Sequence, residues 1–377
     1  MKSIPVILMG CGGVGRQLLQ HIVSCRDIHT KHYGVRLRVV GVADSKSLLS
    51  VPDIFTTELD DHSINEICRL KSDGSCLSSL TSLGSYQVFS NSETITNITE
   101  IAKHLVRSTG LAVVDCSASS DTIVILHKVV ELGGCIVLAN KKPLTSSMED
   151  YDKLVSHPRR LRHESTVGAG LPVIASINRL LSSGDTIHRI VGSLSGTLGY
   201  VMSELEDGKL LSQVVKTAKT LGYTEPDPRD DLGGMDVARK ALIIARLLGQ
   251  KIDLDSIKVE SLYPVEMGSD AMNVEEFLAN GVPQLDNHLA DRVEKAASKG
   301  NVLRYVCVIE GSRCEVGIQE LPRNSALGRL RGSDNVLEVY SRCYSEQPLI
   351  IQGAGAGNDT TATGVLADIL DLQDLFT

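Results

Sequence analysis

The chain reads Ile4-Pro-Val-Ile-Leu-Met-Gly-Cys-Gly-Gly-Val-Gly15 close to its N-terminus. The first six residues have the apolar character of a buried strand, and the apolar residues that follow Gly15 recur at helical spacing. In such a strand–turn–helix unit, Gly10 permits a tight turn, Gly12 lets the backbone approach a pyrophosphate, and Gly15 lets the helix pack closely on the strand. The stretch therefore predicts a dinucleotide-binding turn.

The next apolar run, Leu37–Ala43, predicts a second buried strand, which ends at Asp44. An acidic residue at this point accepts hydrogen bonds from a ribose 2′-hydroxyl and repels a 2′-phosphate, which favours NAD. However, Arg16, Ser45 and Lys46 could hold the 2′-phosphate of NADP instead. The sequence thus predicts a nicotinamide dinucleotide and leaves the choice between NADP and NAD open.

Two further apolar runs, Leu111–Cys116 and Cys135–Ala139, predict strands of the same sheet. Ser117 follows the first run, and Asn140-Lys-Lys142 follows the second. Doubly wound sheets bind ligands at the carboxyl ends of their strands, so a lysine here could neutralise a phosphate or donate a proton. An ordinary capped turn at Ser117 and a solvated lysine are the alternatives.

A second motif is the acidic stretch Gly222–Lys240, whose loop is stiffened by two prolines. It holds five carboxylates: Glu225, Asp227, Asp230, Asp231 and Asp236. From Asp236 onward the apolar spacing is helical, so Asp236 and Lys240 lie one turn apart on the same side of a helix. Such a pair is commonly a solvated surface pair, but the acidic loop before it favours a site for a polar ligand. We assign Asp227 and Asp230 to the structure of the loop.

Composition and charge exclude several classes of protein. The modest net charge of −8 and the lack of a basic stripe argue against nucleic acid as a partner. No apolar run is long enough for a membrane span. The nine cysteines are odd in number and scattered, without a C-x-x-C pair, which is typical of a reducing compartment. The first strand starts too early to leave room for a targeting peptide, so we expect a cytoplasmic protein.

The stretch Gly222–Lys240 resembles the signature of homoserine dehydrogenases, and the resemblance covers nearly the whole chain. It extends to Gly10–Gly15, Ala139–Pro143, Val167–Pro172, Ser195–Tyr200 and Gly353–Asn358. It implies a Rossmann-type doubly wound nucleotide-binding domain over residues 1–155, to which 355–377 return, and an α+β substrate-binding and dimerisation domain over 156–354. It also implies a monofunctional homodimer without a kinase or regulatory extension.

The family's reaction is the reversible, NAD(P)-dependent interconversion of L-homoserine and L-aspartate 4-semialdehyde, a step of threonine and methionine biosynthesis. By resemblance, Lys240 is the proton donor and acceptor, Asp236 orients it or binds the substrate amine, and Lys141 lies near nicotinamide and substrate. Glu225 and Asp231 are the candidates for binding the α-ammonium group, because a buried cation needs carboxylates. The expected cofactor-binding residues are Gly10, Gly12, Gly13, Val14, Gly15, Asp44, Ser117, Lys141 and Gly357.

Two further sets of residues complete the expected site. Thr197 and Tyr200 could offer hydroxyls to a small polar substrate, with a helix N-cap and packing as the alternative. The resemblance also implies a structural sodium-like cation, held by Glu164 and by the main-chain oxygens of Val167 and Ala169, since hard cations take oxygen ligands.

Two other functions stay open. One is a thiol-dependent semialdehyde dehydrogenase with Cys116 as its nucleophile, although no histidine lies in a matching motif. The other is a non-catalytic nicotinamide-binding relative, against which the intact Asp236 and Lys240 argue. The chain departs from the family pattern at Arg323-Asn-Ser-Ala-Leu327, where several relatives carry a His or an Asx-Pro pair. We therefore expect a secondary proton-handling group of those relatives to be missing.

Overall fold

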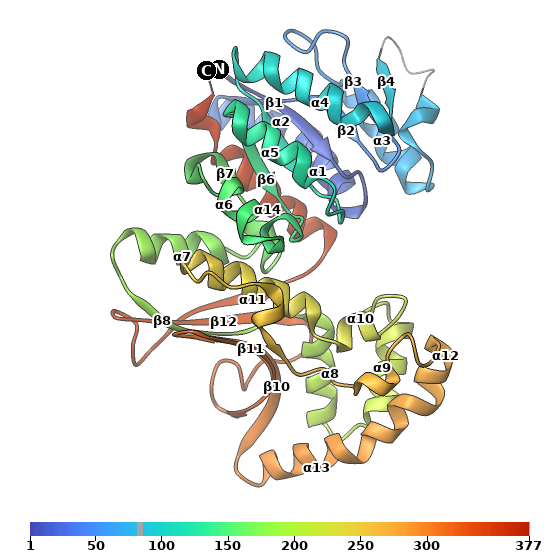
Figure 1. Ribbon diagram of the computed structural model, residues 1–377, viewed down its shortest axis with the longest axis vertical. Coiled ribbons are helices and arrows are strands. Elements are labelled where there is room, and N and C mark those ends of the chain that lie inside the picture. The colour runs from blue at the N-terminus through green and yellow to red at the C-terminus, as the bar shows by residue number, and fades with distance from the viewer. Residues whose placement is uncertain (81–85, 377) are drawn as a thin grey trace. The chain divides into compact units, whose positions relative to one another are not determined.

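The computed structural model describes residues 1–80 and 86–376 (Figure 1). The chain forms two compact units, one of Met1–Gly170 with Gly357–Thr377 and one of Leu171–Ala356. The sequence placed the boundary after residue 155. The segment from there to Gly170 lies in the first unit, where the short strand β7 (Leu161–Arg162) pairs with β6 (Cys135–Leu138).

The first unit contains a seven-stranded sheet in the order β4-β3-β2-β1-β5-β6-β7. Its other strands are β1 (Lys2–Met9), β2 (Val35–Ala43), β3 (Ser47–Ser50), β4 (Gln87–Ser90) and β5 (Ala112–Asp115). Strands β1, β2, β5, β6 and β7 pair in parallel, whereas β3 and β4 form an antiparallel edge. The parallel strands read as continuous apolar runs because both faces of such a sheet are covered.

The helices of the first unit form two groups (Figure 1). In one group α1 (Gly13–Ser24) packs beside α3 (Asp61–Ser72) and α14 (Asn358–Leu370), and the short α2 (Arg26–Ile28) follows α1. In the other, α5 (Ile123–Leu132) packs beside α4 (Asn91–Val106) and α6 (Met148–Leu154). The expectation of an α/β fold with a Rossmann-type nucleotide-binding domain is confirmed.

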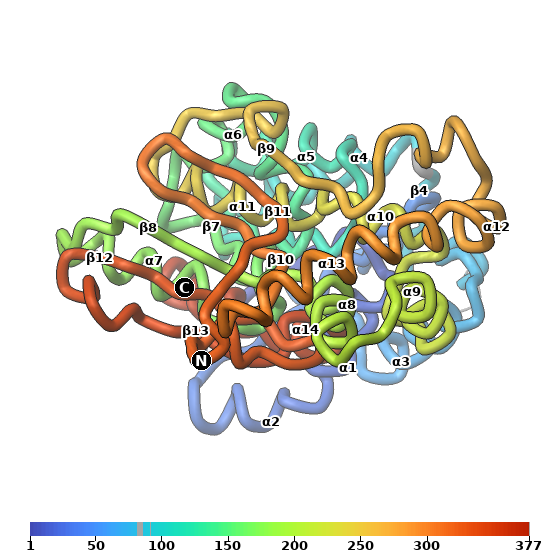
Figure 2. The backbone as a smooth tube through the Cα atoms, turned by 90° about the horizontal axis from the view of Figure 1, so that it is seen from below, coloured from blue at the N-terminus to red at the C-terminus, as the bar shows by residue number. Residues whose placement is uncertain are grey.

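The second unit is an α+β unit with a six-stranded sheet in the order β13-β12-β8-β10-β11-β9. Its strands are β8 (Ile187–Ser193), β9 (Lys258–Val259), β10 (Asn301–Glu310), β11 (Arg313–Pro322), β12 (Asp334–Ser341) and β13 (Leu349–Ala354). Its helices are α7 (Val173–Ser182), α8 (Gly196–Glu206), α9 (Leu211–Thr220), α10 (Arg229–Leu232), α11 (Met235–Leu247), α12 (Val274–Glu276) and α13 (Asp286–Ala297). All strand pairs are antiparallel except β11 with β9. Helix α13 runs along β10, as Figure 2 shows.

The loop between β11 and β12, where the sequence departs from its relatives, is held by a buried arginine. Arg304 is 1% exposed and donates hydrogen bonds to the main-chain oxygens of Leu327, Gly328 and Leu330 at 3.2, 2.7 and 2.9 Å. Its guanidinium also pairs with Glu206 at 2.7 Å. Leu327 and Leu330 pack into an apolar cluster on the sheet. The loop is therefore a packed structural element of the second unit.

Within residues 1–80 and 86–376, no helix is both long and apolar enough to span a bilayer.

Candidate active site

The glycine turn between β1 and α1 has the geometry that a bound pyrophosphate needs. A Cβ on Gly10 (φ +88°) would lie 2.4 Å from the amide nitrogen of Ser117, and a Cβ on Gly15 would lie 2.0 Å from the oxygen of Gly10. Gly12, by contrast, is exposed and has no heavy atom within 4 Å of its Cβ position. Gly12 is also the N-cap residue of α1, and as a glycine it has no side chain that could cap the first N–H groups of the helix. The turn therefore offers backbone donors and an open face to an anion.

The start of α14 lies against the same turn. A Cβ on Gly13 would lie 2.6 Å from the carboxamide of Asn358, which follows Gly357. Gly357 adopts φ +118°, a conformation that L side chains rarely reach, and it forms the N-cap of α14. Gly13 and the first residue of α14, Asn358, thus lie next to each other in the first unit.

A buried carboxylate that the sequence analysis missed links the ends of β5 and β6. Asp115 is fully buried and accepts hydrogen bonds from the Asn140 carboxamide at 3.0 Å and from the N–H of Ser117 at 2.9 Å. The Asn140 carboxamide also lies 3.3 Å from the Ser117 hydroxyl, and its oxygen accepts the N–H of Lys142 at 3.1 Å. The network fixes Ser117 and the start of the lysine pair at the carboxyl edge of the sheet. The one signal for this buried carboxylate in the sequence was an Asp at the end of an apolar strand.

Asp44 lies at the end of β2, as expected, but its carboxylate points into the unit. The side chain is 6% exposed and accepts hydrogen bonds from Lys71 at 2.8 Å and from the N–H groups of Lys46 and Ser47, each at 2.9 Å. With its oxygens engaged in this way, Asp44 does not present a free acceptor to a ribose hydroxyl.

In the second unit, α11 places Lys240 and Asp236 one turn apart. Lys240 is 8% exposed, and its ammonium group contacts the Asp236 carboxylate at 2.7 Å and the main-chain oxygen of Leu194 at 2.7 Å. Leu194 directly follows β8 and precedes the Ser195–Tyr200 motif. Asp236 is 48% exposed at its side chain. The pair is therefore not the solvated surface pair that its spacing alone suggests, because the amine is buried and held from two sides.

The acidic loop brings a second carboxylate next to this pair. Asp231 accepts hydrogen bonds from the Thr197 hydroxyl at 3.1 Å and from the N–H of Glu225 at 2.8 Å. Burial raises the pKa of Asp231 above its ordinary value, although these two hydrogen bonds lower it, and the neighbouring charges of Glu225 and Asp236 raise it further. Glu225, Asp231, Asp236 and Thr197 thus form one acidic cluster, within the second unit, beside Lys240.

Tyr200 is placed differently from Thr197. Its ring stacks edge-on against Tyr223, with 5.1 Å between the ring centroids. Burial and the charge of Glu204 raise the pKa of its phenol.

Asp227 has the structural role that we assigned to it. Its carboxylate binds the guanidinium of Arg229, which is 5% exposed and also donates to the main-chain oxygens of Met267 and Met272 at 3.2 and 2.7 Å. The same guanidinium lies 5.1 Å from the centroid of the Phe277 ring. The contacts clamp the acidic loop to the segment that follows α11. Asp230 is exposed.

The expected cation loop has an unusual backbone. Gly168 and Ala169 both adopt left-handed conformations, with φ of +79° and +56°, and Ala169 is the only non-glycine residue with positive φ in the part of the chain that the structure describes. The N–H of Glu164 donates to Asp368 at 2.9 Å. Among the described residues no group of three or more His, Cys, Asp or Glu side chains forms a metal site.

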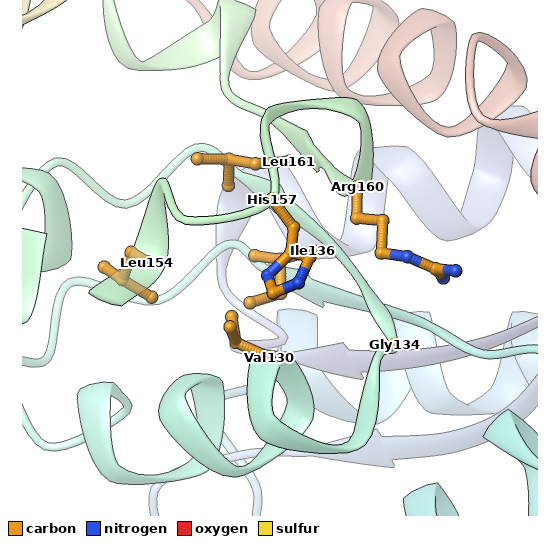
Figure 3. A pocket seen from close by; sticks show the side chains of 7 residues that line it. All are labelled: Val130, Gly134, Ile136, Leu154, His157, Arg160 and Leu161. Carbon is orange, nitrogen blue, oxygen red and sulfur yellow. The ribbon is translucent and has the colours of Figure 1, made fainter. Parts of the chain in front are cut away.

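Two other features of the first unit, a small cavity and the Cys116 thiol, give no support for a site of their own. The cavity in Figure 3 is lined by Val130, Gly134, Ile136, Leu154, His157, Arg160 and Leu161 and holds about 10 Å³, room for one water. None of the predicted site residues lines it. Burial, with lesser contributions from the neighbouring Asp115 and Cys11, raises the pKa of the Cys116 thiol, which argues against Cys116 as a nucleophile.

Comparison with known proteins identifies the family. Residues 172–370 match the family model described as homoserine dehydrogenase. The homoserine dehydrogenase of Emericella nidulans is 40% identical over 291 residues, which cover 72% of this chain and 78% of that protein. The chain belongs to the homoserine dehydrogenase family. The membership that the motifs indicated is thereby confirmed.

Other relatives of this homoserine dehydrogenase family member are longer or differ more. The bifunctional aspartokinase/homoserine dehydrogenase of Haemophilus influenzae is 35% identical over 373 residues, which cover 98% of this chain but 43% of that protein. The chain thus spans less than half of that bifunctional relative. Among solved structures, a Candida auris protein of unknown function has a TM-score of 0.85 at 30% identity, covering 100% of this chain and 99% of that one. A hyperthermophilic archaeal homoserine dehydrogenase in complex with NADPH shares the fold, with a TM-score of 0.71 at 22% identity and coverage of 100% and 99%.

Proposed function

We propose that this chain is a homoserine dehydrogenase, which interconverts L-homoserine and L-aspartate 4-semialdehyde with a nicotinamide dinucleotide. The observation that carries the proposal is the buried amine of Lys240, which is held by Asp236 and by the oxygen of Leu194 beside the acidic cluster. A small zwitterionic alcohol fits this arrangement, because its ammonium group needs carboxylates and its reacting oxygen needs a proton donor.

The residues divide the work of binding and proton transfer. The nicotinamide, when bound, supplies or accepts the hydride. The glycine turn Gly10–Gly15, with Ser117, Lys141 and Gly357 around it, holds the dinucleotide through backbone N–H groups. Lys240 donates a proton to the oxygen of the aldehyde as this oxygen becomes an alkoxide, and it takes the proton back in the reverse direction. Asp236 keeps the ammonium group oriented.

Replacing Asp231 by asparagine raises the KM for homoserine by about 10- to 100-fold, the scale of one lost charge-assisted hydrogen bond. The cause is the loss of a carboxylate that is already ordered by Thr197 and by the N–H of Glu225. The matched control is Asp230→Asn on the same loop, whose exposed side chain we assign to loop structure. Steady-state rates at varied homoserine measure both, and equal KM values for the two variants would remove Asp231 from the substrate site.

The raised pKa of Asp231 gives this binding a pH dependence. A carboxylate whose pKa lies above its ordinary value takes up its proton at a higher pH than a solvated Asp does. The KM for homoserine therefore rises, as the pH falls, before an ordinary carboxylate titrates. Since the Asp231→Asn variant has no proton to take up there, its KM lacks this rise.

A monovalent cation at the loop around Ala169 remains part of the proposal. The left-handed conformations of Gly168 and Ala169 change the direction of successive main-chain carbonyl groups. The left-handed conformation of Ala169 is strained, and such backbone strain persists only where the surrounding structure holds it. Glu164 and the oxygens of Val167 and Ala169 are its ligands. We expect the urea midpoint of unfolding to be higher in sodium chloride than in choline chloride of equal ionic strength. A Glu164→Gln variant loses that difference, and an equal midpoint of the native chain in the two salts contradicts the site.

We also infer a homodimer through the sheet of the second unit. Strand β13 is an edge strand, and Ile350 on it is 44% exposed. An apolar edge strand is a surface that natural proteins usually cover. Light scattering that gives the mass of a single chain contradicts the dimer.

Product analysis tests the reaction itself. Incubated with L-aspartate 4-semialdehyde and reduced dinucleotide, the protein yields L-homoserine without added phosphate and is insensitive to iodoacetamide. A thiol-dependent semialdehyde dehydrogenase instead oxidises the aldehyde with oxidised dinucleotide and phosphate, so it forms no homoserine in this incubation, and its own reaction is lost on alkylation. A non-catalytic relative binds the dinucleotide and forms no product.

A further inference from the structure

The carboxylate at the end of β2 is fully occupied by groups of its own unit. One oxygen of Asp44 accepts the N–H groups of Lys46 and Ser47, each at 2.9 Å, and the Ser47 hydroxyl at 3.2 Å. The other accepts the Lys71 ammonium at 2.8 Å and the N–H of Leu77 at 3.1 Å. The side chain of Asp44 is 6% exposed and that of Lys71 is 17% exposed. Five donors thus hold one carboxylate away from solvent.

This arrangement changes the cofactor preference that an acidic residue at the end of β2 usually indicates. A free Asp here binds the ribose 2′-hydroxyl and repels a 2′-phosphate. Burial raises the pKa of Asp44, but the hydrogen bonds from Lys71 and from the N–H groups of Lys46 and Leu77 outweigh it, so the pKa lies below its ordinary value. Asp44 is therefore ionised, and the adjacent Lys71 ammonium neutralises its charge.

The exposed groups around this strand end are basic or hydroxylic. Ser45 and Lys46 are exposed, and Arg16 is half-buried in the first turn of α1, with its Nε 3.4 Å from the oxygen of Gly12. The net charge of this set is +2, from the three cations Arg16, Lys46 and Lys71 and the one anion Asp44. A 2′-phosphate monoester carries about −1.5 to −2 near neutral pH.

The end of β2 lies beside the glycine turn, because the N–H of Gly10 donates to the main-chain oxygen of Ala43, the residue before Asp44, at 2.9 Å. Arg16 directly follows Gly15 of the turn. The charges of Lys71, Asp44 and Arg16 also act on the thiol of Cys11 in the turn, whose pKa burial raises to about 12. The charged set and the turn therefore belong to one site at the carboxyl edge of the sheet.

We propose that Lys71 is a specificity-determining residue: by holding and neutralising Asp44 it makes this strand end a 2′-phosphate site, so that the enzyme prefers NADP over NAD. Lys46 and Arg16 bind the phosphate, and Lys71 acts through Asp44. This specificity presupposes the proposed function, because it needs a nicotinamide dinucleotide on the glycine turn.

Calorimetric titration with two cofactor fragments tests the proposal without turnover. Adenosine 2′,5′-bisphosphate carries the 2′-phosphate, and 5′-AMP lacks it. We expect the native protein to bind the bisphosphate about tenfold or more tightly than AMP, the scale of a charge-assisted contact. Lys46→Ala lowers this ratio by removing a phosphate ligand. Lys31→Met, on an exposed lysine of the same unit, leaves it unchanged.

The decisive variants are Lys71→Met and Lys71→Met combined with Asp44→Asn. The single variant leaves the negative charge of Asp44 without a neighbouring cation to neutralise it, so the preference falls by about tenfold or more, whereas the double variant lacks that charge and regains most of the preference. The ratio of kcat/KM with NADP to kcat/KM with NAD is expected to change in the same way: it falls in the single variant and recovers in the double variant. A purely structural role of Lys71 gives no rescue in the double variant.

Three results overturn the proposal. One is equal affinity of the native protein for the two fragments, and another is an unchanged ratio in Lys71→Met. The third is a double variant that behaves as the single one. Since AMP binding still reports an intact glycine turn in these cases, they leave the proposed function standing, whereas binding of neither fragment contradicts both.

Discussion

Replacing Lys240 by methionine lowers kcat for homoserine oxidation by about 10²–10⁴-fold, the usual contribution of a positioned acid or base. Methionine keeps the length and apolar stem of the lysine, which matters because the residue is 8% exposed. What it removes is the ammonium group that contacts Asp236 and the oxygen of Leu194, each at 2.7 Å. The proton then has no donor on the protein.

The measurement needs two controls. Lys251→Met removes an exposed lysine just after α11 and should leave kcat unchanged. The affinity of Lys240→Met for adenosine 2′,5′-bisphosphate should also be unchanged, because the dinucleotide-binding groups belong to the first unit. A Lys240→Met enzyme with native kcat refutes the role of this amine, and one that has lost fragment binding indicates a wider disruption.

The second large effect is expected in the glycine turn, where two alanine substitutions separate folding from binding. Gly15→Ala places a Cβ 2.0 Å from the oxygen of Gly10 inside the packed turn. The clash costs about 1–3 kcal/mol of stability, as overpacking usually does, and it moves the donors away from the cofactor. Both the urea midpoint of unfolding and dinucleotide affinity therefore fall.

Gly12→Ala is the matched change. Its Cβ has no protein atom within 4 Å, so the free energy of unfolding in urea stays within about 0.5 kcal/mol of the native value. Dinucleotide affinity nevertheless falls, because the methyl group occupies the face that the pyrophosphate approaches. Native affinity in Gly12→Ala places the pyrophosphate elsewhere, and native stability in Gly15→Ala contradicts the packing of the turn.

The parts of the site that the sequence predicted are local in the chain. The glycine turn follows from residues that span one strand end and one helix start, and the contact between Asp236 and Lys240 follows from their spacing on α11. Neither requires knowledge of the tertiary fold. The acidic loop and the family resemblance suggested a polar-ligand site at this pair, but the burial of Lys240 does not follow from the helix period.

The parts that were missed depend on residues far apart in the sequence. Asp115 and Asn140 are 25 positions apart and meet because β5 and β6 are neighbours. Asp44 was expected to face a ribose, but Lys71, 27 positions away, and the N–H of Leu77 turn it inward. Sequence patterns do not report such partners, because the tertiary fold brings these residues together.

Short strands were missed for a related reason. Strand β3 is the four residues Ser47–Ser50, and β13 covers Leu349–Ala354, too few residues for a clear alternation of apolar and polar side chains. Each forms because a neighbour supplies its hydrogen bonds, β2 in the first case and β12 in the second. The antiparallel edge forms in the same way, because β3 supplies the hydrogen bonds of β4.

The reduction of oxidised dinucleotide by the purified protein on addition of L-homoserine tests the central claim most directly. We predict nicotinamide reduction that saturates with homoserine, proceeds without phosphate and is faster with NADP than with NAD at equal concentration. A protein that binds the dinucleotide yet reduces none of it with homoserine contradicts the assignment of Lys240 and the acidic cluster to this reaction.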